Sequence, residues 1–165
     1  MKQIIGNGDI AQALQEVDKD LLFFASGVSN SQETREDEYE REVVLLMNQD
    51  RSKHLVYFSS LAVFYSETRY TRHKLNIERL IKRFFSSYTI IRLGNITWGT
   101  NPSTLINYLK AHPEAEIQDV YRYIVDKDEF LHWIELIPNW NVEMNIPGRR
   151  LKVAEIVERI KKGLL

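Results

Sequence analysis

Cysteine is absent from this sequence, and proline and glycine are scarce, with 4 and 7 residues among 165. The lack of cysteine excludes disulfide bonds and thiolate chemistry, and it fits a reducing compartment. No long apolar run occurs, and the opening segment MKQIIGNG breaks after two apolar positions, so it reads as neither a signal peptide nor a membrane span. No low-complexity tract or linker divides the chain. We therefore expect one cytoplasmic domain over residues 1–165.

An excess of charge of one sign is also lacking, because 22 basic residues face 23 acidic ones and the net charge is -1. This balance gives no broad electrostatic attraction to nucleic acid or to an anionic membrane, so we expect a small-molecule partner. The four histidines show no ligand spacing, which with the lack of cysteine argues against a metal site. They are His54, His73, His112 and His132.

Short apolar runs alternate with segments of helical periodicity, a pattern typical of βα units around a mainly parallel sheet. The predicted strands cover residues 3–5, 21–25, 55–59 and 89–92. The predicted helices cover residues 10–17, 38–48, 69–85 and 152–162, with one more opening at Asn101 and Pro102 and another at Asp126, where Glu129 completes a capping-box spacing. In the helix over 38–48, Tyr39, Val43 and Met47 share one stripe. The sequence predicts an α/β fold.

A glycine-rich turn follows the first predicted strand and precedes the first helix. It reads G-x-G-x-x-A over Gly6, Asn7, Gly8, Asp9, Ile10 and Ala11. In a dinucleotide fingerprint the first glycine permits the turn, the second admits the pyrophosphate, and a small third residue lets helix and strand pack closely. The alternative is a glycine-rich turn without a ligand, and no acidic residue ends a second strand about 20 residues later, as such a site requires. Both interpretations stay open at this point.

Tyr70 and Lys74 are four residues apart in the helix predicted over 69–85, so they share one face. A nearby ammonium lowers the pKa of a phenol, which lets the phenol exchange a proton with a substrate near neutral pH. Lys74 belongs to the same apolar stripe as Ile77 and Ile81, and a lysine directed inward usually has a partner or a role. The alternative is an exposed tyrosine beside a solvated lysine.

Ser60 closes the apolar run that begins at residue 55. Ligands of open parallel sheets bind beyond the carboxyl ends of the strands, where a serine can hydrogen-bond a carbonyl or hydroxyl group. A strand-end cap is the alternative role for this serine.

Three segments in the middle of the chain, VYFSSLAVF from residue 56, YTRHK from residue 70 and IIRLGNI from residue 90, resemble the extended short-chain dehydrogenase/reductase family of NAD-dependent epimerase/dehydratases. The segment LFFASGVS from residue 22 is similar to the family's fourth strand. The resemblance implies a Rossmann-like fold that binds NAD or NADP, acts on a hydroxyl or keto group, possibly of a nucleotide-sugar, and forms a homodimer through the helices over 38–48 and 69–85.

The resemblance also implies roles for individual residues. Tyr70 would be the general acid and base, Lys74 would bind the nicotinamide ribose and tune the tyrosine, and Ser60 would orient the substrate. Asn95 would lie near the substrate or the nicotinamide end of the cofactor. The cofactor would be bordered by Gly6, Asn7, Gly8, Asp9, Ile10, Ala25, Gly27 and Lys74.

The choice of Ser60 depends on the alignment of one aromatic residue. In the family the catalytic hydroxyl stands four residues before an aromatic that matches Phe64, which selects Ser60 rather than Ser59. Aligning Tyr65 instead would put Leu61 at that position and leave the trio incomplete. Both alignments stay open.

The sequence departs from the family in two regions. The second and third strands, which carry the adenosine contacts, have no counterpart between the first helix and the strand over 21–25, and the substrate region over 95–150 is short. The first strand should therefore form an open edge unless a partner subunit covers it. We weigh two hypotheses: an NAD(P)-dependent enzyme, and a non-catalytic Rossmann scaffold that binds a nucleotide, a metabolite or a protein.

Overall fold

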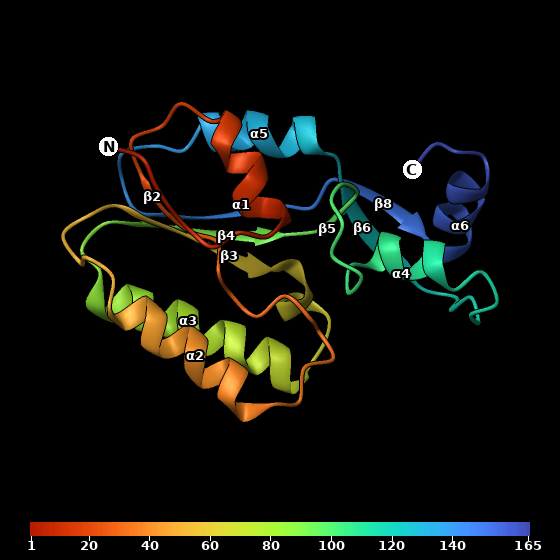
Figure 1. Cartoon of the computed structure of the whole chain (residues 1–165), viewed down its shortest axis with the longest axis horizontal. Coiled ribbons are helices and arrows are strands. Elements are labelled where there is room, and N and C mark those ends of the chain that lie inside the picture. The colour runs from red at the N-terminus through yellow and green to blue at the C-terminus, as the bar shows by residue number, and fades with distance from the viewer.

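The computed structural model describes residues 1–165 and contains two sheets (Figure 1). The larger sheet has five strands in the order β1-β2-β3-β4-β7, and each strand runs parallel to its neighbours. These strands are β1 (Gln3–Ile5), β2 (Leu22–Phe24), β3 (Leu55–Ser60), β4 (Tyr88–Leu93) and β7 (Val142–Ile146). The predicted α/β class with a mainly parallel sheet is confirmed.

Helices cover both faces of this sheet (Figure 1). On one face lie α1 (Asp9–Ala13), the 3-10 turn η1 (Leu14–Glu16) that continues it, and α5 (Lys127–Glu135); on the other lie α2 (Glu36–Met47) and α3 (Arg69–Phe84). Successive side chains of β3 therefore enter two cores: Val56 and Phe58 pack on the α1 and α5 side, and Leu55 and Tyr57 on the α2 and α3 side. This double burial explains why the strand reads as a continuous apolar run.

A smaller sheet lies beside the carboxyl end of β4. Its order is β5-β6-β8, with β5 (Asn95–Ile96), β6 (Tyr121–Val125) and β8 (Arg149–Lys152). Helices α4 (Leu105–Ala111) and α6 (Val153–Lys161) pack on it through Ile106, Ile124 and Ile156. No strand of this sheet was predicted, since runs this short carry little periodicity. The 3-10 turn η2 (Leu61–Phe64) links β3 toward α3.

The predicted start of α4 is wrong, and the start of α5 is confirmed without its predicted capping box. The N-cap of α4 is Thr104, whose hydroxyl accepts the Asn107 N–H, and not Asn101. Asn101 stays in the preceding turn because its backbone N–H donates to the Asp9 carboxylate. Asp126 is the N-cap of α5, but its side chain makes no capping hydrogen bond, since it accepts from Thr97 and pairs with Arg149.

The buried stripe of α2 also differs from the predicted one. Tyr39 is buried as expected, but Glu42 and Leu46 accompany it, while Val43 and Met47 are only partly buried. The helix is thus rotated so that a carboxylate enters the core. The buried position of Lys74 on α3 is confirmed.

β1 is the edge strand of the larger sheet, as expected for a chain that lacks the family's second and third strands. The segment 17–21 alone connects η1 to β2. None of the helices is both long and apolar enough to cross a lipid bilayer.

Replacing Gly6 with alanine should lower the free energy of unfolding by about 1–3 kcal/mol, the usual cost of a strained backbone. The reason is that Gly6 has φ 121° and that an added Cβ would lie 2.3 Å from the Ala25 carbonyl oxygen. Urea unfolding measures the loss. Gly8→Ala is the matched control, because a Cβ there meets nothing within 4 Å; equal losses in both variants would contradict this view of the turn.

Candidate functional site

A single large cleft, of about 1590 Å³, opens at the carboxyl edge of the larger sheet. Parallel strands end at the same edge, so the loops that follow β1, β2, β3 and β4 meet there. Of the residues singled out in the sequence, ten line this cleft: Asn7, Gly8, Asp9, Ile10, Ala25, Gly27, Ser60, Tyr70, Lys74 and Asn95. Gly6 is not among the lining residues.

The first turns of α3 bring Tyr70 and Lys74 to the cleft. Thr68 caps the helix through a capping box in which its hydroxyl accepts the Thr71 N–H and the Thr71 hydroxyl accepts the Thr68 N–H. The helix start is thereby fixed two residues before Tyr70. Lys74 follows one turn later, and its Nζ lies 5.4 Å from the centre of the Tyr70 ring.

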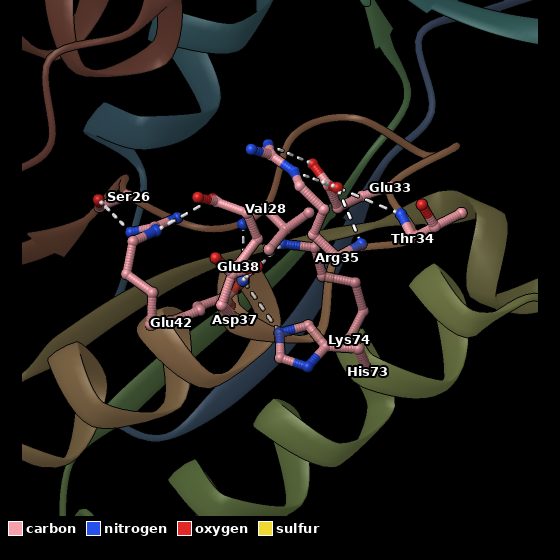
Figure 2. A network of polar contacts seen from close by, with 11 residues as sticks. Ser26, Val28, Glu33, Thr34, Arg35, Asp37, Glu38, Glu42, His73 and Lys74 are labelled. Atoms are coloured by element: carbon pink, nitrogen blue, oxygen red, sulfur yellow. Dashed lines mark hydrogen bonds and ion pairs between the residues drawn. The ribbon is translucent and has the colours of Figure 1, made fainter.

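The ammonium of Lys74 is paired with a buried carboxylate that sequence reasoning missed. Its Nζ lies 3.5 Å from Glu42 Oε1. Figure 2 shows Lys74 and His73 reaching from α3 toward Glu42 on α2. The same carboxylate accepts hydrogen bonds from the Val28 N–H at 2.7 Å and the Tyr57 hydroxyl at 2.6 Å, and it lies 3.1 Å from His73 Nε2.

These contacts decide the charge of the buried carboxyl. Burial alone would raise the pKa of Glu42, but the charge of Lys74 and the hydrogen bonds from His73 and Tyr57 outweigh it and lower that pKa to about 2. Burial, and then the charge of Glu42, raise the pKa of Tyr57 well above its usual value, so the phenol keeps its proton. Glu42 is therefore a fixed negative charge, buried behind the cleft beside Lys74.

Ser60 and its neighbours have different surroundings. Ser59 and Ser60 both border the cleft, but Ser59 is buried and donates its hydroxyl proton to Glu78, whereas Ser60 is partly exposed; Leu61 is buried. The Ser60 hydroxyl accepts the Ala62 N–H at 3.1 Å, so its own proton can still be donated into the cleft. Asn95 donates its amide N–H to the Tyr123 carbonyl, which leaves its side-chain oxygen able to accept a hydrogen bond.

The glycine-rich turn combines an open position with a negative charge. A Cβ at Gly8 would meet nothing within 4 Å, so the backbone there borders open space. Asp9 is the first residue of α1, and its carboxylate accepts the N–H groups of Thr100 and Asn101, each at 3.0 Å. These two hydrogen bonds connect the segment after β5 to the glycine-rich turn, and they hold the Asp9 carboxylate at that turn.

The fit of a dinucleotide cofactor differs between its two halves. The hydroxyl of Ser60 and the side-chain oxygen of Asn95 suit the nicotinamide half, and the open space at Gly8 suits the pyrophosphate. The Lys74 ammonium, in contrast, is almost inaccessible beneath the Gly27 loop. The adenosine half has no matching residues, because no strand lies beyond β1 to supply the acid that binds its ribose. The Asp9 carboxylate also disfavours an anionic pyrophosphate at the turn.

Glu42 could have been found from the sequence by asking which acid neutralises an inward-directed lysine. It lies three residues after Tyr39 and four before Leu46, which is the spacing of one helix face. The preceding charged run, over residues 33–41, conceals this pattern. Most of that run is exposed to solvent.

No protein-family model matches the chain, and no curated protein matches it in sequence. Solved structures do match. The enzyme WbmG of Bordetella bronchiseptica, in complex with NAD and UDP, has a TM-score of 0.65 and 15% identity, over 86% of this chain and 55% of WbmG. A UDP-galactose 4-epimerase matches with a TM-score of 0.61 and 13% identity, over 86% of this chain and 61% of the epimerase.

The dTDP-4-dehydrorhamnose reductase of Bacillus anthracis, in complex with NADP, has a TM-score of 0.62 and 15% identity, over 92% of this chain and 64% of the reductase. The chain therefore spans less than two thirds of each of these three enzymes. At such identities the likeness establishes the fold alone, a Rossmann-like α/β fold that these three enzymes share over part of their length.

The low pKa of Glu42 predicts a loss of stability in acid. A carboxylate with a folded pKa of about 2, against 4.5 when unperturbed, stabilises the fold fully above pH 4.5, and this contribution is lost as the pH falls toward 2. Its size is on the order of 3 kcal/mol. In urea unfolding, the difference in free energy between wild type and Glu42→Gln should shrink over that interval. A difference independent of pH would contradict the assignment.

Proposed function

We propose that this chain is an NAD(P)-dependent oxidoreductase or epimerase/dehydratase-like enzyme that acts on a hydroxyl or keto group of a nucleotide-sugar. The observation that carries the proposal is the meeting of Ser60, Tyr70 and Lys74 in one cleft, at the edge where parallel sheets bind ligands. The substrate class rests on the likeness to WbmG, which was crystallised with NAD and UDP, and to the UDP-galactose epimerase.

Each of the three residues has a role that its surroundings support. Tyr70 takes the proton of a substrate hydroxyl, or returns it to a keto oxygen, as general base and acid. The Lys74 ammonium, with its Nζ 5.4 Å from the Tyr70 ring centre, places a positive charge beside the tyrosine. Ser60 donates its hydroxyl proton to the same substrate oxygen, since its lone pair is engaged by Ala62.

The cofactor contacts would come from the nicotinamide side of the cleft. NAD(P), when bound, accepts or returns the hydride of the carbon that bears the hydroxyl. The residues that would hold it are those of the turn from Asn7 to Ile10, with Ala25 and Gly27. Because the adenosine side has no strand beyond β1, we expect weaker cofactor binding than in an enzyme with both halves.

Replacing Tyr70 with phenylalanine should lower turnover at least about 100-fold, because the general acid and base is lost. Turnover is assayed with NAD(H) and NADP(H) against a panel of UDP-sugars and dTDP-sugars. Cofactor binding and the unfolding midpoint should stay at wild-type values, since Tyr70 is only partly buried and the change removes a single oxygen atom. Retained turnover in Tyr70→Phe would refute the assignment.

A second candidate function is a non-catalytic Rossmann scaffold that binds a nucleotide, a metabolite or a protein. The Asp9 carboxylate at the glycine-rich turn favours it, because a negative charge there opposes a pyrophosphate. Calorimetric titration with NAD(H) and NADP(H) separates the two candidates. Binding that is abolished by Gly8→Val, whose side chain enters the open space at the turn, supports the enzyme. No binding at millimolar cofactor supports the scaffold.

A further inference from the structure

Lys74 and Glu42 form an ion pair that is buried in the protein. Both side chains are almost inaccessible, at 2% and 0% exposure. A buried ammonium is costly unless an opposite charge accompanies it, and Glu42 is the only carboxylate within ion-pair distance of Lys74. The place of the ammonium is therefore set by the place of this carboxylate.

Glu42 is itself held from three directions. The loop after β2 provides the Val28 N–H, β3 provides the Tyr57 hydroxyl, and α3 provides His73. A carboxylate bound to three separate elements has little freedom to move. It fixes the lysine that it attracts.

Gly27 closes the space above the ion pair. A Cβ at Gly27 would lie 2.7 Å from Lys74 Nζ and 3.2 Å from Glu42 Oε1, so the loop backbone rests directly on both groups. The ammonium is confined between this loop and two phenol rings, with the ring centres of Tyr57 and Tyr70 at 5.3 Å and 5.4 Å.

We propose that Glu42 is a positioning residue for the catalytic trio, because its buried carboxylate holds the Lys74 ammonium beside Tyr70. This inference rests on the proposed function for its catalytic consequence. The other titratable groups around the ammonium are Tyr57 on β3 and Tyr70 and His73 on α3. Glu78, one turn further along α3, is already paired with Arg92 and Ser59, which leaves Glu42 as the counter-charge.

A double-mutant cycle tests the placement without any cofactor or substrate. Glu42→Gln and Lys74→Met are made singly and together, and urea unfolding is followed at pH 7. Each single variant leaves one buried charge unpaired, so its unfolding midpoint should fall, and the double variant should recover more than half of the larger loss. Tyr57→Phe is the matched control, since it removes one hydrogen bond and keeps the pair, and its midpoint should fall less. Additive losses would overturn the proposal.

Turnover measurements then separate positioning from stability. Glu42→Gln should lower kcat at least tenfold when Lys74 is present, and it should cause no further loss in the Lys74→Met background. An equal loss in both backgrounds would mean that Glu42 does not act through Lys74. If Glu42→Gln does not fold, Gly27→Ala serves instead: it keeps both charges and displaces the ammonium, so kcat should fall in a folded protein, and an unchanged kcat would count against the proposal.

The two proposals fail in different ways. A wild-type protein without turnover on any substrate of the panel would refute the proposed enzyme. The unfolding cycle would still decide the placement, because a double variant that recovers stability supports the pairing, and one that does not refutes it.

Discussion

The parallel pairing of β3 with β2 on one side and β4 on the other is the constraint on which the site depends. Leu55 pairs with Leu22 and with Tyr88, so the three strands run in one direction and end at one edge. Ser60, at the last position of β3, lies beside Leu93, and the loop after β2 reaches the same edge. Reversing any one of these strands would carry its loop to the opposite end of the sheet and separate the trio.

Strand β3 connects the apolar core to the ion pair of Glu42 and Lys74. Leu55 and Tyr57 pack against α2 and α3, and Tyr57 then offers its hydroxyl to Glu42. Apolar packing thus sets the distance between the two helices, and an ion pair bridges them at the end where the cleft opens. Since an unpaired charge at this depth would be costly, the core and the ion pair constrain each other. A substitution that alters the packing between β3 and the helices α2 and α3 would therefore also displace the Lys74 side chain.

Much of the larger sheet could be predicted, because strands buried on both faces are continuous apolar runs and α3 has a regular stripe. The trio followed from spacing and from a family resemblance. The smaller sheet was missed, since its strands are short and half exposed. In the larger sheet β7 was missed, because it alternates polar and apolar residues as an edge strand does. Glu42 and the Asp9 contacts were missed for other reasons. The Asp9 contacts join segments far apart in the chain, about which local pattern carries no information, whereas the helical spacing of Glu42 was concealed by the charged run before it.

The larger sheet ends on one side at β1, which is protected from pairing with other chains. This edge strand has only three residues, and short edge strands resist unwanted pairing. Lys2, just before it, donates to the carbonyls of Leu14, Gln15 and Val17, which closes the end of α1 and η1 over the strand. Lys53 donates to Gln3 beside it. The short length of β1 and these lysine contacts therefore protect the same edge, and together they let the sheet end there without a further strand.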